Sequence, residues 1–179
     1  MTIHFGTSGW RAVIADEFTF AAVSRVTEAI CLQFTSEQGA QQLIVAHDSR
    51  FLGEHFADQC SQIVYQHGFS ALRCVGPTPT PAVSHAIRAN KAVCGINFTA
   101  SHNPPEYNGM KLSTADGAPA LPAVTQKLES ILANFDQKQN PVNKPGKTED
   151  HDPRAAYLAD LKDKIRFDVI AKANARYVY

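Results

Sequence analysis

The sequence predicts an α/β fold in which helices pack on a mixed, mostly parallel sheet. Segments with apolar residues at helical spacing alternate along the chain with short runs rich in β-branched residues. Polar, turn-forming residues follow several of these runs, as is typical of layered α/β proteins whose loops beyond the strand ends hold ligands. The chain has 179 residues, of which 44% are hydrophobic, and this is enough for one sizeable core.

The first part of the chain supplies two helices and a strand between them. Apolar side chains in residues 23–34 recur at i, i+3, i+7 and i+11, which predicts a helix with one buried face. Residues 43–46 form a short β-rich run closed by the polar residues 47–50, the pattern of a buried strand that ends in a loop. Helical spacing returns in residues 56–64, and Gly68 is expected to end that helix because glycine readily adopts the left-handed conformation.

Strands and helices continue to alternate in the middle of the chain. Three further strands are expected, at residues 70–75, 93–98 and 109–113. A proline-rich turn over residues 77–81 leads into a short helix, 82–88, which Pro81 starts. Another amphipathic helix is expected over residues 124–135.

A change of composition predicts a domain boundary. Residues 1–135 form the first domain, and the polar, proline-containing residues 136–151 suit an interdomain linker. Residues 152–179 are expected to begin a second, truncated domain, with Asp152 as the N-cap of a helix and a strand starting at Arg176. Because such a strand would leave backbone groups unpaired, we expect this chain to be part of a longer protein.

Composition excludes several function classes. Lys and Arg together number 17, as do Asp and Glu, so no net field favours nucleic acid or an anionic membrane. The apolar runs are too short to cross a bilayer and the start lacks a signal-peptide pattern, so a cytoplasmic protein is expected. Four cysteines lie far apart without a C-x-x-C pair, which predicts buried, reduced thiols. They are Cys31, Cys60, Cys74 and Cys94.

The polar loop over residues 99–111 is the strongest candidate for chemistry. Pro104 and Pro105 each fix φ and remove a backbone donor, so the loop should be stiff. It presents the hydroxyl of Ser101 from the end of a buried strand, and Lys111 follows on the next strand. Taken alone, however, the turn-forming residues of this loop are also consistent with a purely structural role.

A second candidate segment lies near the N-terminus. Gly6 and Gly9 would let backbone N–H groups approach an anion, and Thr7 and Ser8 add hydroxyl donors. Arg11, placed in this glycine-rich turn, adds a planar fork suited to phosphate. By itself such a turn is weak support for an anion site.

Two reactions compete for Ser101. A hydrolase would need His102 as its base, but adjacent side chains in extended backbone point to opposite sides, which disfavours a direct hydrogen bond. Phosphoryl transfer needs a fixed hydroxyl and cations around the phosphate, and Arg11 and Lys111 are the available cations. Phosphoryl transfer is therefore the favoured chemistry.

Four segments together resemble the α-D-phosphohexomutase family, the phosphoglucomutases and phosphomannomutases. In the family's order they are residues 6–11, 47–50 (HDSR), 77–81 (PTPTP) and 99–111 (TASHNPPEYNGMK). The resemblance runs over the whole chain, and the last segment is highly specific. It implies a three-layer α/β/α domain, as in domain I of phosphohexomutases.

The resemblance also implies roles for individual residues. Ser101 matches the serine that carries a phosphoryl group, and through that phosphate it would be a ligand of Mg²⁺. Arg11 and Lys111 match residues that assist proton transfer and stabilise phosphate, and His102 flanks the serine. The implied substrate- and phosphate-binding residues are Thr7, Ser8, Asn103 and Asn108.

The implied activity is that of an isomerase, an intramolecular phosphotransferase. Phosphate would move between C1 and C6 of a hexose phosphate through phosphoserine and a bound 1,6-bisphosphate, with one Mg²⁺ per full-length enzyme and glucose 1,6-bisphosphate as activator. Domains II–IV of the same polypeptide would be partners, and no D-x-D-x-D metal loop occurs in this chain. We therefore expect the isolated chain to bind metal weakly and to be inactive.

Two alternatives stay open at this point. One is a noncatalytic module that binds sugar phosphates with the same loops. The other is a fragment of a phosphoglucosamine mutase within the same family, although Trp10 beside Arg11 counts against it.

Overall fold

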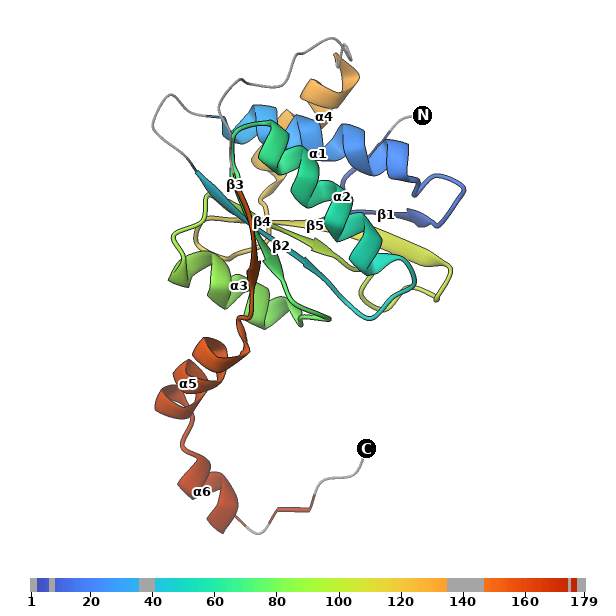
Figure 1. Ribbon diagram of the computed structural model, residues 1–179. Helices are drawn as coiled ribbons and strands as arrows, with labels where there is room; N and C mark the ends of the chain where they lie inside the picture. The colour runs from blue at the N-terminus through green and yellow to red at the C-terminus, as the bar shows by residue number, and fades with distance from the viewer. Residues whose placement is uncertain (1–2, 7–8, 36–40, 135–146, 174, 177–179) are drawn as a thin grey trace.

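The fold is built on a six-stranded mixed sheet with the strand order β1-β5-β4-β2-β3-β6 (Figure 1). This computed structural model describes residues 3–6, 9–35, 41–134, 147–173 and 175–176. The strands are β1 Gly9–Val13, β2 Gln42–His47, β3 Ser70–Cys74, β4 Cys94–Phe98, β5 Tyr107–Thr114 and β6 Lys147–His151. Strand β2 pairs in parallel with β3 and β4, and β6 does so with β3, whereas β5 runs antiparallel to β1 and β4. The predicted mixed, mostly parallel sheet is confirmed.

Helices cover both faces of the sheet and complete three layers. The larger core lies under α1 (Phe20–Phe34), α2 (Gly53–Gln66) and α4 (Pro122–Ala133). Apolar side chains of these helices pack there against those on one face of the central strands. The opposite face holds a smaller core under α3 (Thr80–Ala89), built from Val83, Ile87 and apolar residues of β2 and β3. The sheet therefore has one well-covered face and one face that α3 covers only in part.

The helix signals in the sequence are confirmed, with small shifts at the ends. Thr19 caps α1 by accepting a hydrogen bond from the backbone N–H of Ala22 at 3.2 Å. Gly68, with a φ of 81°, follows the end of α2 in the left-handed conformation that only glycine adopts without strain. Helix α3 begins at Thr80, two residues earlier than expected, because proline is tolerated in the first turn.

Strands β1 and β6 lie at the two edges of the sheet and were not predicted. Strand β6 is almost entirely exposed and has no apolar alternation, so its sequence gives no strand signal. It pairs with β3, and Arg73 on β3 forms ion pairs with Asp150 on β6 and Asp58 on α2. The expected linker of residues 136–151 is thus corrected, because its last five residues belong to the sheet.

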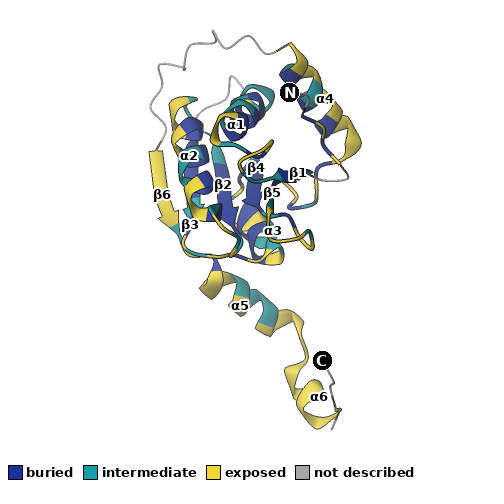
Figure 2. Ribbon diagram, turned by 90° about the vertical axis from the view of Figure 1, so that its right-hand side faces the viewer, coloured by how far each residue is buried: buried dark blue, intermediate teal, exposed yellow. Residues whose placement is uncertain are grey.

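Two helices extend from one end of the sheet beyond β6. Helices α5 (Arg154–Lys164) and α6 (Phe167–Lys172) have no buried residue. Figure 2 shows α6 exposed along its length, whereas part of α5 is half-buried. Pro153, not Asp152, is the N-cap of α5, although the Asp152 carboxylate still accepts a hydrogen bond from the Arg154 N–H at 3.0 Å. The strand expected from Arg176 falls almost wholly outside the described residues. The division into two domains stays a prediction.

The cysteines match the expectation from their spacing. All four are free and buried. Burial raises the pKa of Cys60 to about 12 and that of Cys74 to about 11, so these thiols stay protonated and unreactive near neutral pH. Within the described ranges, none of the helices has the length and apolar character needed to cross a membrane.

Candidate active site

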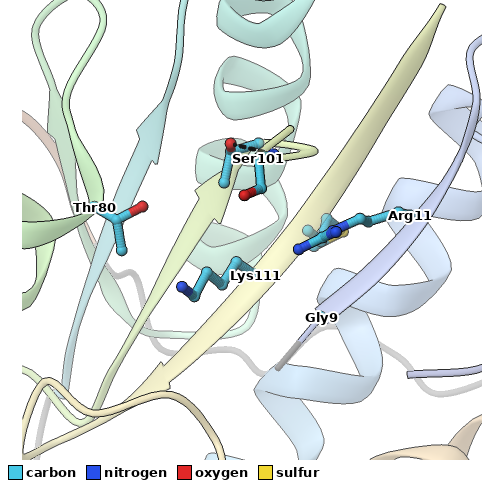
Figure 3. Close-up of a pocket in the computed structure, with 7 residues that line it drawn as sticks. Gly9, Arg11, Thr80, Ser101 and Lys111 are labelled. Carbon is cyan, nitrogen blue, oxygen red and sulfur yellow. Dashed lines mark hydrogen bonds between the residues drawn. The ribbon is translucent and has the colours of Figure 1, made fainter. Parts of the chain in front are cut away.

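A small pocket of about 70 Å³ opens where the β4–β5 loop meets the start of α3. Its lining combines two cations with three hydroxyl groups. The lining residues are Gly9, Arg11, Thr80, Thr99, Ser101, Met110 and Lys111. Figure 3 shows Arg11, Lys111 and Thr80 arranged around the space below Ser101. The structure therefore brings the predicted catalytic serine and both predicted cations into one cavity.

Strand alternation explains why the two cations share this face of the sheet. Trp10 and Met110 are cross-strand partners buried in the larger core, so their neighbours on β1 and β5 project to the opposite face. On that face Lys111 lies opposite Gly9, and Arg11 lies opposite Gly109. Arg11 is thus part of a strand and not of a glycine-rich turn, which corrects the sequence-based placement.

The backbone at Ser101 is not extended. Its φ of 58° is left-handed, and its N–H donates a hydrogen bond to Thr99 Oγ1 at 3.0 Å. In this conformation Ser101 Oγ lies 3.3 Å from His102 Nδ1, within hydrogen-bond distance. The prediction that the two adjacent side chains diverge is wrong, because the backbone at Ser101 is not extended. Both side chains are exposed, as groups that react with a bound substrate must be.

Arg50 holds the serine loop in place, a role that its position in the HDSR segment alone does not reveal. Its guanidinium donates four hydrogen bonds, of 2.6 to 3.0 Å, to backbone carbonyls of the loop. The acceptors are the carbonyl oxygens of Ser101, Asn103, Pro104 and Tyr107. Asp48 lies beside the guanidinium, 3.5 Å from Arg50 Nε, and both residues come from the HDSR segment after β2. Stiffness of the loop thus has a second cause besides its prolines.

The two predicted cations differ in their contacts. Arg11 donates a hydrogen bond to Asn103 Oδ1 at 3.0 Å, so Asn103 braces the guanidinium at the rim of the pocket. Lys111 is half-buried, and within the described part of the chain no hydrogen bond or ion pair involves its ammonium group. An anion in the pocket would therefore be the natural partner of the Lys111 charge.

Other predicted residues lie outside the pocket or outside the described residues. Asn108 is fully buried, donates to the Phe51 carbonyl and accepts from the Gly109 N–H, so it shapes the strand and cannot reach a substrate. Thr7 and Ser8 fall outside the described residues. Trp10 is buried and stacks on Phe18 with ring centroids 4.6 Å apart, so it faces away from the pocket and cannot discriminate between sugars.

The described residues do not fit a complete magnesium site. They contain no group of three or more His, Cys, Asp or Glu side chains that could hold a metal ion. The lining of the pocket carries no carboxylate, and its charged groups are both positive. The chemistry of this lining suits an anion such as phosphate rather than a bare cation.

A family model described as phosphoglucomutase/phosphomannomutase, alpha/beta/alpha domain I, matches residues 2–139 of this chain. That range contains every residue of the pocket lining.

Individual proteins similar to this chain are named as mutases of the same kind. A probable phosphoglucosamine mutase from Pyrococcus abyssi is 30% identical over 165 residues, which are 92% of this chain and 36% of the relative. A phosphoglucosamine mutase from Clostridium acetobutylicum is 33% identical over 128 residues, 72% of this chain and 28% of the relative. A crystal structure of a protein assigned as a phosphomannomutase from Thermus thermophilus superposes with a TM-score of 0.83 and 37% identity. That superposition covers 94% of this chain and 37% of the other, so the present chain spans about a third of the length of these relatives.

Proposed function

The chain belongs to the phosphoglucomutase/phosphomannomutase family through its α/β/α domain I, and from this premise we propose that Ser101 carries the phosphoryl group of a phosphohexomutase reaction. One observation carries the proposal: an exposed serine hydroxyl, on a loop held by Arg50, shares a pocket with Arg11 and Lys111. A fixed nucleophile surrounded by cations is what phosphoryl transfer requires of a protein.

The phosphorylation of Ser101 can be written in terms of this chain's own groups. Ser101 Oγ attacks the phosphorus atom of a hexose bisphosphate, and the bond between phosphorus and the sugar oxygen breaks. His102 Nδ1, 3.3 Å from Oγ, is the group placed to accept the hydroxyl proton, and that proton, passed on through solvent, protonates the departing sugar oxygen. In the reverse direction phosphoserine returns the phosphoryl group to a sugar hydroxyl, so the serine is regenerated.

Arg11 and Lys111 supply the electrostatic part of the proposed step. Negative charge spreads over the phosphoryl oxygens during transfer, and preorganised cations stabilise it without reorganising. Arg11 is oriented for this role by its hydrogen bond to Asn103, whereas Lys111 enters the pocket from the neighbouring strand. We assign no step to Mg²⁺, because the described residues contain no group of three or more His, Cys, Asp or Glu side chains that could hold it.

The proposed substrates are hexose phosphates, and two kinds of sugar are candidates. The curated relatives are named phosphoglucosamine mutases and the structural neighbour a phosphomannomutase, so an amino sugar is one candidate and a neutral hexose the other. Parallel incubations with glucose 1,6-bisphosphate and glucosamine 1,6-bisphosphate would separate them, since faster phosphorylation of Ser101 by one donor identifies the preferred sugar.

We expect no sustained mutase turnover from the chain alone. Removing a single electrostatic group from an active site lowers kcat by a factor of about 10²–10³. The chain aligns with 36% of a relative's length, and we expect the remaining contacts with the substrate to come from the rest of a full-length enzyme. The check is an assay of glucose 1-phosphate conversion in the presence of Mg²⁺ and catalytic glucose 1,6-bisphosphate. Many turnovers per chain would contradict this expectation.

Intact-mass spectrometry tests the proposal itself. The chain is incubated with excess glucose 1,6-bisphosphate and Mg²⁺, and we expect the mass of one phosphoryl group to be added to a large fraction of the molecules. Ser101→Ala should abolish the addition. Ser130→Ala, on the exposed face of α4, is the matched control and should be phosphorylated as the wild type is.

The noncatalytic alternative gives the opposite result. A module that only binds sugar phosphates would bind the bisphosphate but gain no covalent mass, in the wild type as in Ser101→Ala. Addition that persists in Ser101→Ala would likewise overturn the assignment of Ser101.

A further inference from the structure

Thr80 is a member of the pocket to which neither the sequence motif nor the family match assigns a role. It comes from the PTPTP turn and is the first residue of α3, so its side chain lies at the N-terminal end of that helix. Figure 3 shows the hydroxyl on the side of the pocket opposite Arg11, with the Lys111 ammonium between them. The hydroxyl therefore closes the ring of polar groups below Ser101.

A buried amide fixes the orientation of that hydroxyl. Asn97 lies on β4 opposite Lys111 in the sheet register and is 3% exposed. Its Nδ2 donates a hydrogen bond to Thr80 Oγ1 at 3.2 Å, and its Oδ1 is buried without a partner among the described residues. A polar side chain in the middle of a sheet, with half of its amide unsatisfied, is costly unless its placement serves another group.

The direction of the hydrogen bond determines what Thr80 can offer to a ligand. A hydroxyl has one proton to donate and two lone pairs that accept. Because Asn97 Nδ2 occupies a lone pair, the Thr80 proton remains available for a hydrogen bond into the pocket. No other acceptor for that proton is found among the described residues. The oriented hydroxyl thus acts as a donor.

The surroundings specify an anionic oxygen as the acceptor. The pocket contains two cations and no carboxylate, and the first turn of α3 adds the positive end of a helix dipole. From this geometry, and on the basis of the function proposed above, we propose that Thr80 donates a hydrogen bond to an oxygen of the phosphoryl group at Ser101, and that Asn97 is the positioning residue that orients it. The donor would stabilise the phosphoryl group from the side opposite Arg11.

Binding of inorganic phosphate tests this role without requiring any reaction at Ser101. The dissociation constant is measured from amide chemical shifts of the ¹⁵N-labelled chain for the wild type, Thr80→Val and Thr80→Ser. Thr80→Val keeps the shape but removes the proton, and the constant should rise about tenfold, the effect of one hydrogen bond to a charged group. Thr80→Ser restores the hydroxyl and should bind within about twofold of the wild type.

A substitution at Asn97 tests whether the hydrogen bond to Thr80 Oγ1 matters for phosphate binding. Asn97→Asp places a carboxylate where the amide donor was, so the Thr80 proton would turn toward it and phosphate should bind at least as weakly as to Thr80→Val. Thr125→Val, at a buried threonine in the first turn of another helix, is the control and should bind phosphate as the wild type does. Thermal melts establish that each variant is folded.

Several outcomes would overturn the proposal. They are a wild type that binds no phosphate, a Thr80→Val variant that binds as the wild type does, or a Thr80→Ser variant that fails to recover. The function proposed for Ser101 is judged separately, by covalent phosphorylation. If Ser101 is phosphorylated but Thr80→Val leaves the dissociation constant for phosphate unchanged, only the inference about Thr80 is refuted.

Discussion

Replacing Arg50 with lysine is expected to loosen the serine loop and to slow phosphorylation of Ser101 at least tenfold. Lysine keeps the positive charge, but its ammonium group cannot donate to all four carbonyl oxygens. The planar guanidinium does so because Nη1 and Nη2 each donate to two of them. Each lost hydrogen bond to a charged donor is worth about 1.5–3 kcal/mol when it is buried, and less where water reaches it. We therefore expect a loss of about 2 kcal/mol in the free energy of unfolding.

Amide hydrogen exchange reports on the loop directly. The N–H groups of Asn103 and Tyr107 donate to Ala100 and Pro104 within the loop, so they should be protected in the wild type and exchange at least tenfold faster in Arg50→Lys. Arg88→Lys is the matched control, since Arg88 donates to one backbone carbonyl, that of Asp116, at 3.3 Å. Unchanged exchange at both loop amides, together with an unchanged phosphorylation rate, would show that the arginine does not hold the loop.

Gly109→Ala is expected to be among the most damaging single-methyl additions in this sheet. A Cβ at this position would lie 2.6 Å from the Thr99 carbonyl oxygen and 2.8 Å from that of Trp10. Both neighbours are backbone atoms, so strand β1 or the start of the serine loop would have to move. Overpacking of this kind costs about 1–3 kcal/mol, and the displacement would also carry Arg11 away from Ser101.

Urea denaturation and the phosphorylation assay measure the two effects together. Gly6→Ala is the control, because a Cβ there would meet only the Gly9 carbonyl oxygen, at the ordinary contact distance of 3.6 Å. Gly6 does not line the pocket and its N–H donates to the Gly9 carbonyl oxygen, so we expect Gly6→Ala to unfold within about 1 kcal/mol of the wild type and to be phosphorylated normally. If Gly109→Ala is as stable and as readily phosphorylated as Gly6→Ala, the close approach of β1, β5 and the serine loop is not needed for the site.

The central elements of the fold could be predicted from the sequence because burial leaves a periodic pattern. Strand β4 is buried at every position and helix α1 buries one face, so both show in the spacing of apolar residues. Edge strand β6 leaves no such pattern, because nearly all of its residues are exposed. It is polar and is held by pairing with β3 and by the ion pair between Asp150 and Arg73, and these are long-range contacts.

Site residues that stand together in one sequence segment could be predicted, whereas contacts between distant segments could not. Ser101 and Lys111 could be identified because they stand in one specific segment, whereas the contact of Arg50 with that segment joins residues more than fifty positions apart. Asn108 belongs to the same segment yet is buried, because register with β1 turns its side chain away from the pocket. Residue type and spacing do not reveal which side of a strand faces a ligand until the pairing is known.

The position of the phosphoryl group is the most direct test of the central claim. Ser101 Oγ and His102 Nδ1 lie 3.3 Å apart, and either could in principle be phosphorylated by a bisphosphate in this pocket. Phosphoserine survives acid, whereas phosphohistidine is hydrolysed, so peptide mapping by tandem mass spectrometry before and after acid treatment distinguishes them. We predict an acid-stable phosphate on Ser101 alone. An acid-labile phosphate on His102, or no covalent phosphate on either residue, would contradict it.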